Sequence, residues 1–281
     1  MQRPAEILDL DHISFIEPFF SDLPDNRFTS LLEEIIGDQG RLLIDEDSDP
    51  ICMAVHTEED TWVAGCLHLR KPTEALIARF EDLGGDIFQE DRKIWEAAVR
   101  GYYSKDIASG ITPALEDLNP ARTGLVDSLV SEVLGDGSGQ SCLDCGCGSG
   151  VGSLVLRNRG YSTLSCDNDP SLLSLGFVKG RLVPEETMLI DASQLSRYIG
   201  HCDAGLGLMF GEIHEFNAGM WEQITIELIM MTDRCLITTG TEREAVRISQ
   251  WAGKCDAQTE IFENTRDPIY DRWVCSIALR K

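Results

Sequence analysis

Three glycines at alternate positions, Gly146, Gly148 and Gly150, form the part of the sequence best suited to binding a cofactor. Strand-forming residues ending at Asp144 precede them, and a helix is expected to begin near Gly152. Glycine removes the side chains that would keep a ligand away from the backbone, and a helix N-terminus offers free N–H groups. The segment therefore indicates a loop that a cofactor approaches closely, although tight glycine turns also occur for purely structural reasons.

The glycine spacing does not fit a dinucleotide site. Such a site has Gly-x-Gly-x-x-Gly or Ala, whereas the final position here is Val151 when counted from Gly146 and Ser153 when counted from Gly148. A pyrophosphate also has little use for the carboxylate of Asp144, whereas a charged amino group would be favoured beside it. The pattern therefore favours a ligand that carries an amino group.

Two further acidic residues, Asp167 and Asp191, follow at the predicted ends of the next two strands. Ligands of open α/β sheets bind beyond the carboxyl ends of the strands, so the loop and both acids are expected at one edge. An aspartate at a strand end can instead cap the following helix. The order and spacing of the three features indicate a common binding site.

From Ser141 to Lys281 the sequence resembles the class I (Rossmann-like) S-adenosylmethionine (SAM)-dependent methyltransferase family. Four segments carry the resemblance: the glycine segment beginning at Asp144 matches the family's first motif, 166–170 its second strand end, 190–192 the loop after its third strand, and 202–204 the entry to its fourth strand. The terminal pair of antiparallel strands is a further resemblance to the family. The resemblance implies that the protein transfers a methyl group from SAM.

The same resemblance implies a role for each matching residue. Asp144, Gly146, Gly148 and Gly150 would hold the methionine end of SAM. The ribose hydroxyls would bind Asp167, and the adenine would meet Asn168, the Asp191 side chain and the backbone N–H of Ala192.

The loop after the fourth predicted strand, residues 210–216, is where the methyl acceptor is expected. His214 could act as a general base because the pKa of imidazole lies near neutrality, and Glu212 or Glu215 could orient it or bind a cationic acceptor. A packing histidine and acids favoured by a helix dipole are the structural alternatives. The loop lacks the Asn/Asp-Pro-Pro-Tyr/Phe motif of family members that methylate nucleobases and certain protein amides. A base is dispensable where the acceptor is already nucleophilic.

Cys142 and Cys145 form a Cys-x-x-Cys pair, a spacing found in zinc and redox sites. The sequence has no second Cys-x-x-Cys to complete a zinc site, and a redox pair should open a helix rather than straddle a strand end. We therefore expect no metal site and ten free, mostly buried thiols.

The elements that position these residues alternate between strand and helix after Gly139, a pattern typical of a parallel sheet. Helices are expected to begin near Gly152, Pro170, Ser193, Asn217 and Glu242, and strands at 141–144, 162–166, 187–190, 204–209 and 235–239. The last two strands, 259–263 and 273–279, are too close in sequence for a crossover helix and must be antiparallel. The predicted fold class is α/β: a doubly wound, mostly parallel sheet with an antiparallel C-terminal hairpin.

Residues 1–91 are predicted to form a smaller α+β module that covers the site or selects the acceptor. A helix is expected at 28–36, an antiparallel meander at 41–45, 51–57 and 61–69, and a helix from Pro72 to Leu83. Residues 92–281 are predicted to form the methyltransferase domain with a helical lead-in. Tyr102 or Tyr103 of this lead-in could touch the cofactor, but the spacing of Trp95, Val99 and Tyr103 also describes a packing face.

The formal net charge of −24 disfavours nucleic acid and anionic membranes as partners, because binding them usually depends on Lys and Arg. No apolar run approaches the length of a membrane span, and the N-terminus lacks the apolar core of a signal peptide, so a cytoplasmic location is expected. The predicted acceptor is a nucleophile on a small molecule or a protein side chain. The alternative is a non-catalytic SAM-binding or scaffolding protein, and the oligomeric state is left open.

Overall fold

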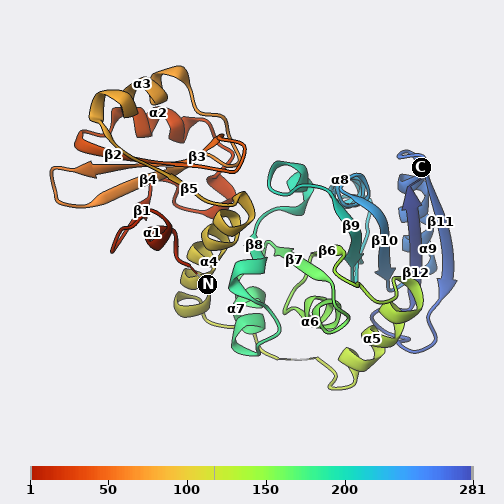
Figure 1. The fold of residues 1–281 in the computed structure, drawn as a ribbon. Helices are drawn as coiled ribbons and strands as arrows, with labels where there is room; N and C mark the ends of the chain where they lie inside the picture. Colours follow the sequence, from red (N-terminus) through yellow and green to blue (C-terminus); the bar gives the residue numbers. More distant parts are fainter. Residues whose placement is uncertain (1, 117, 280–281) are drawn as a thin grey trace. The chain divides into compact units, whose positions relative to one another are not determined.

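The computed structural model describes residues 2–116 and 118–279. It divides into two compact units, an N-terminal unit up to Lys105 and a C-terminal unit from Asp106 onward, each built on its own β-sheet (Figure 1). Each unit is described separately below.

The N-terminal unit has an α+β fold, with five described strands in the order β1-β4-β3-β2-β5. Its described strands are β1 (Ser14–Phe15), β2 (Gly37–Ile44), β3 (Pro50–Thr57), β4 (Trp62–Cys66) and β5 (Gly85–Gln89). Its helices are α1 (Pro4–Ile7), η1 (Phe20–Asp22), α2 (Arg27–Glu34), α3 (Glu74–Leu83) and most of α4 (Arg92–Gly110). Helices α2 and α3 cover one face of this sheet (Figure 1), where Leu32, Met53 and Leu76 are fully buried.

The predicted meander is confirmed, because β2 pairs antiparallel with β3 and β3 with β4. Two parallel edge strands were not predicted: β1 has only two residues, and the mostly exposed β5 begins at Gly85, directly after Gly84, the C-cap of α3. Thr73 caps α3 by accepting a hydrogen bond from the N–H of Leu76, so Pro72 precedes the cap instead of starting the helix.

The predicted domain boundary after Asp91 differs from the division of the structure, which falls within α4. The reason is that Trp95, Val99 and Tyr103 are buried, and Tyr103 donates a hydrogen bond to the carbonyl of Glu17 at 2.9 Å. These residues form the packing face that was the alternative for Tyr103. The first and last residues of the predicted domains, Met1 and Lys281, lie outside the described part of the chain.

The C-terminal unit confirms the predicted fold class. Its described strands lie in the order β11-β12-β10-β9-β6-β7-β8, and all neighbours pair in parallel except β10 with β12 and β12 with β11. The parallel strands are β6 (Ser141–Cys145), β7 (Ser162–Asp167), β8 (Thr187–Leu189), β9 (Cys202–Gly207) and β10 (Thr232–Thr239). The hairpin consists of β11 (Ala257–Glu263) and β12 (Trp273–Leu279).

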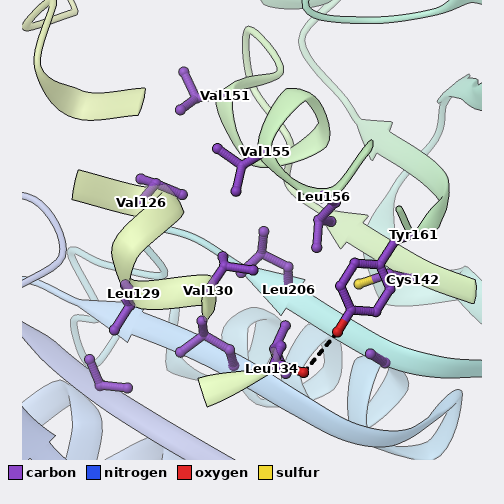
Figure 2. Close-up of a cluster of buried hydrophobic side chains, with 13 residues drawn as sticks. Val126, Leu129, Val130, Leu134, Cys142, Val151, Val155, Leu156, Tyr161 and Leu206 are labelled. Atoms are coloured by element: carbon purple, nitrogen blue, oxygen red, sulfur yellow. Dashed lines mark hydrogen bonds between the residues drawn. The ribbon is translucent and has the colours of Figure 1, made fainter. Parts of the chain in front are cut away.

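The helices of this unit are α5 (Arg122–Val133), α6 (Val151–Asn158), α7 (Pro170–Val178), η2 (Pro184–Glu186), η3 (Ala192–Arg197), α8 (Ala218–Met230) and α9 (Glu242–Gly253). A buried cluster joins α5 and α6 to the sheet, with Val130, Val155 and Leu206 among its members (Figure 2). The hydroxyl of Tyr161 donates to the carbonyl of Leu134 at the end of α5. Both helices are thereby fixed beside β6, the strand that leads into the glycine loop.

The chain reverses its direction of travel across the sheet between β6 and β9. From β6 it proceeds to β7 and β8 on one side, and β9 then lies on the other side of β6. Such a switch point opens a crevice at the carboxyl ends of the strands, where open α/β sheets bind their ligands. The fold therefore places the predicted site beyond β6, β7 and β9.

Candidate functional site

A cavity of about 260 Å³ lies at the carboxyl ends of these strands. One side is formed by strand ends and contains Cys145, Gly146, Asp167, Asn168, Ile190, Asp191 and Ala192. The other side is apolar and comes from the loop after β9 and from α8: Leu208, Met209, Phe210, Met220, Trp221 and Ile224. Of the eight residues predicted to bind the cofactor, the structure brings five to this cavity: Gly146, Asp167, Asn168, Asp191 and Ala192.

Asp167 ends β7 and joins the glycine loop to the start of α7. Its Oδ2 accepts a hydrogen bond from the N–H of Gly148 at 2.8 Å, and its Oδ1 accepts one from the N–H of Asp169 at 2.9 Å. Asp169, not Asp167, caps α7 by accepting bonds from the N–H groups of Ser171 and Leu172. Burial raises the pKa of Asp167. A carboxylate has about four acceptor positions, so the two backbone bonds leave capacity for ligand hydroxyls.

Asp191 follows β8 and has two roles. Its Oδ1 accepts a hydrogen bond from the N–H of Ser193 at 2.9 Å, which caps η3, and its side chain also lines the cavity. The structural alternative of a capping aspartate is therefore confirmed, and the adenine contact stays a prediction. The helix predicted at Ser193 is a short 3-10 helix, interrupted by non-helical backbone at Gln194.

All three motif glycines adopt positive φ angles, but each is needed for a different structural reason. Gly146 lines the cavity, and a Cβ atom there would come no closer than 3.7 Å to Phe210. At Gly150 a Cβ atom would lie 2.6 Å from Cγ of Leu182, so packing excludes a side chain. Gly148 supplies the N–H that binds Asp167. Only Gly146 of the three borders the cavity, whereas the resemblance assigned all of them to the methionine end of SAM.

Asp144 does not line the cavity but is buried beneath it, with 1% of its surface exposed. Its Oδ2 accepts a hydrogen bond from the hydroxyl of Ser153 at 2.6 Å. A Cβ atom at Gly152 would come within 2.8 Å of this carboxylate, so that glycine makes room for it. Successive strand side chains point to opposite faces, which explains why Cys145 lines the cavity while Asp144 faces α6. Asp144 is therefore not part of the cavity lining, and its contact with the amino group of SAM stays a prediction.

Burial raises the pKa of Asp144 to about 6, compared with an ordinary value of 3.8. Between these pH values the folded protein retains a proton that the unfolded chain has lost, so this group costs stability as the pH rises through the window. We therefore expect Asp144→Asn to gain free energy of unfolding relative to the wild type as the pH is raised from about 4 to about 6. Urea unfolding at several pH values measures this difference.

Asp271, whose pKa is also raised, is present in both proteins and should cancel in this comparison. A free-energy difference between the variant and the wild type that is the same at every pH would contradict the account of Asp144.

The predicted catalytic pair lies outside the cavity lining. His214 is exposed, its ring stacks on Phe216 with centroids 5.5 Å apart, and its backbone N–H donates to Oδ1 of Asn217. Glu212 and Glu215 are exposed as well, and the carbonyl of Glu212 accepts a hydrogen bond from the Asn217 side chain. The general-base role of His214 and the orienting role of Glu212 stay predictions.

The sequence analysis missed the apolar wall of the cavity. Phe210 packs against Trp221 of α8 with ring centroids 5.1 Å apart, and Met220 and Ile224 extend the wall along the same helix. The spacing of Met220, Trp221 and Ile224 on a helix was the available signal, but it is equally typical of an ordinary core face. Glu244 was also missed: its Oε1 accepts a hydrogen bond from the N–H of Ile213 and so anchors the far end of the loop after β9.

The ionisable groups of the lining are two carboxylates and one thiol. Asp167 and Asp191 lie at the ends of neighbouring strands, and the pKa of Cys145 is held well above its usual range by its hydrogen bond with Cys166 and by burial. All ten cysteines lie in the described part of the chain and are free, and nine are buried, as predicted. The cavity therefore suits a ligand with hydroxyl or amino groups on one side and a flat apolar group on the other.

Within residues 2–116 and 118–279, no group of His, Cys, Asp and Glu side chains could hold a metal ion, and no helix has the length and hydrophobicity needed to cross a membrane.

The chain was also compared with known proteins. Its sequence matches no protein-family profile and is not detectably similar to any curated protein. Among solved structures it is similar to magnesium protoporphyrin IX methyltransferase from Synechocystis with bound SAM, at 18% identity and a TM-score of 0.46, over 65% of this chain and 96% of that one. It is also similar to precorrin-6y C5,15-methyltransferase from Geobacter metallireducens, at 12% identity and a TM-score of 0.43, over 62% and 96% of the two chains.

The C-terminal unit has the mostly parallel seven-stranded sheet, within the described residues, and the antiparallel hairpin that the resemblance to class I methyltransferases implies. The predicted doubly wound, mostly parallel sheet with its antiparallel hairpin is thus confirmed. What the protein binds and does must be inferred from the residues of its own cavity.

Proposed function

We propose that this protein binds SAM and transfers its methyl group to a nucleophile on a small molecule or a protein side chain. One observation carries the proposal: Asp167 and Asp191, at the ends of the paired strands β7 and β8, line the same cavity as Gly146. The glycine leaves the backbone accessible, and the two carboxylates offer acceptors to hydroxyl and amino groups.

The residues that line the cavity fit the adenosine part of SAM. Asp167 would accept the ribose hydroxyls, while Asp191, Asn168 and the backbone of Ala192 would meet the adenine, whose flat face suits the apolar wall. SAM is cationic at its sulfonium and amino groups, and the charged side chains of the lining are both carboxylates. The neighbour from Synechocystis was crystallised with SAM, which agrees with this choice of cofactor.

Bound SAM supplies an electrophilic methyl group on sulfur. Among the residues that the structure describes, the cavity lining includes no His, Lys or Tyr, so the lining residues act mainly by orienting the reactants and excluding water. Met209 and Met220 line the cavity yet are about half exposed, which places them at its opening. Flexible thioether side chains adapt to apolar surfaces, so these two residues are suited to contact the methyl acceptor. The acidic net charge makes nucleic acid the least favoured acceptor.

The test of this function is incubation of the full chain with methyl-labelled SAM and a cell extract separated into protein and small-molecule fractions. We expect label to appear in one of the two fractions and to identify the acceptor class. Saturable SAM binding without label in either fraction would favour the alternative, a non-catalytic SAM-binding protein.

A further inference from the structure

Met209 has an unusual backbone conformation at the wall of the cavity. It follows β9 closely, lines the cavity, and has a φ angle of 58°, in the left-handed region that residues other than glycine seldom occupy. Such a conformation persists only where surrounding contacts hold it. Contacts from neighbouring residues must therefore hold Met209 in this conformation.

Thr238 of β10 provides those contacts. Its hydroxyl accepts a hydrogen bond from the N–H of Met209 at 2.8 Å, and its carbonyl accepts one from the N–H of Phe210, also at 2.8 Å. The Thr238 hydroxyl in turn donates to Oδ1 of Asp271 at 2.5 Å. Because a backbone N–H can only donate, the single hydroxyl proton is left for Asp271, and the direction of both bonds is fixed.

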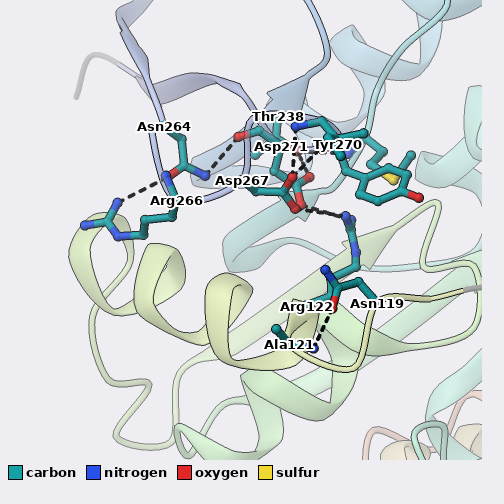
Figure 3. A network of polar contacts seen from close by, with 11 residues as sticks. Asn119, Ala121, Arg122, Thr238, Asn264, Arg266, Asp267, Tyr270 and Asp271 are labelled. Carbon is teal, nitrogen blue, oxygen red and sulfur yellow. Dashed lines mark hydrogen bonds and ion pairs between the residues drawn. The ribbon is translucent and has the colours of Figure 1, made fainter.

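Asp271 is itself held by a buried arginine (Figure 3). Arg122 of α5 lies 3.0 Å from Oδ2 of Asp271 and 3.5 Å from Oδ2 of Asp267, and the Asn264 side chain donates to the carbonyl of Asp271. Arg122, Asp267 and Asp271 are all at most 5% exposed. A chain of polar contacts thus runs from α5 through the β11–β12 connection and β10 to the wall of the cavity.

We propose that Thr238 is a positioning residue for cofactor binding: oriented by Asp271 and Arg122, its hydroxyl holds Met209 and Phe210 in the conformation that closes the apolar side of the cavity. The inference rests on the proposed function in one respect, that the ligand of the cavity is SAM. Thr238 itself does not line the cavity and acts through its two neighbours on the β9 loop.

The test compares three variants. Thr238→Val keeps the shape of the side chain but removes the hydroxyl, and we expect it to bind SAM about tenfold more weakly, which corresponds to the loss of one well-placed hydrogen bond. Thr238→Ser retains the hydroxyl and should bind SAM within about threefold of the wild type. The matched control is Thr239→Val, because Thr239 is also fully buried but its hydroxyl donates to the carbonyl of Thr241, away from Met209.

Amide hydrogen exchange of the ligand-free protein tests whether Thr238 holds Met209, whichever ligand the cavity binds. We expect the amide of Met209 to exchange about tenfold faster in Thr238→Val than in the wild type, with no change in Thr239→Val. Unchanged exchange at Met209, or equal losses of SAM affinity in Thr238→Val and Thr239→Val, would overturn the proposal. If the wild type failed to bind SAM, the proposed function would fail, while exchange at Met209 would still decide whether Thr238 holds the loop.

Discussion

Asp167→Asn is expected to weaken SAM binding by about a hundredfold while leaving the protein folded. The substitution preserves the size of the side chain and one acceptor oxygen, but it removes the negative charge and the second acceptor. Hydrogen bonds to a charged group contribute about 1.5–3 kcal/mol, and a hundredfold change corresponds to about 2.7 kcal/mol. Since Gly148 and Asp169 already donate one bond to each oxygen of Asp167, little capacity for ribose hydroxyls remains in the amide. Isothermal titration calorimetry with SAM measures the effect.

Asp169→Ala is the matched control, because Asp169 lies two residues away and caps α7 without lining the cavity. Loss of this cap should cost about 1 kcal/mol of stability. Its backbone N–H, which binds Asp167, is retained, so SAM affinity should remain within about twofold of the wild type. Equal affinities for wild type and Asp167→Asn, or equal losses in both variants, would remove Asp167 from the cofactor site.

Arg122→Met is expected to lower the free energy of unfolding of the C-terminal unit by about 3–5 kcal/mol, the cost typical of breaking a buried ion pair. Methionine fills much of the same volume but leaves Asp267 and Asp271 without their cation (Figure 3). Both aspartates are almost fully buried, at 5% and 1% exposed, so water cannot compensate. Urea unfolding followed by circular dichroism measures the loss.

Arg159→Met provides the comparison on the protein surface. Arg159 also bridges two aspartates, Asp127 and Asp136, each at 2.9 Å, but their side chains are 44% and 77% exposed. Exposed ion pairs contribute at most about 1 kcal/mol, so this variant should lose far less stability. Similar losses of stability in the two variants would show that the buried ion pairs of Arg122 stabilise the protein no more than the exposed ion pairs of Arg159.

The mostly parallel sheet and the terminal hairpin of the C-terminal unit follow from patterns in the sequence. Alternating strands and helices require a parallel sheet, and the short connection between the last two strands requires a hairpin. The edge strands β1 and β5 escaped prediction because neither has the length or the buried pattern of an independent strand. The division falls within α4 because Tyr103 and Trp95 are buried in the N-terminal unit. Helical spacing shows that these residues share one face of the helix, but it does not show which unit that face packs against.

The residues that line the cavity were predictable to the extent that strand ends determine them. Asp167 and Asp191 reach the cavity because parallel neighbouring strands bring their carboxyl ends together. The direction of individual side chains was not predictable: Asp144 turns toward Ser153, and His214 is exposed to solvent beside Phe216.

The network of polar contacts that supports the cavity wall could not be predicted from the sequence, for a different reason. Arg122, Thr238 and Asp271 are far apart along the chain, and each is of a type common in its own helix, strand or turn. Only the folded sheet brings β10 and the hairpin connection to the loop after β9. Arg122, Thr238 and Asp271 support the cavity wall because the fold brings them together, not because they form a local motif.

Calorimetric titration of the wild-type chain with SAM tests the central claim most directly. We predict saturable binding to one site per chain, with the affinity reduced in Asp167→Asn and retained in Asp169→Ala. Absence of binding heat and of saturation, with folded protein confirmed by circular dichroism, would contradict the assignment of the cavity to SAM and with it the proposed methyl transfer.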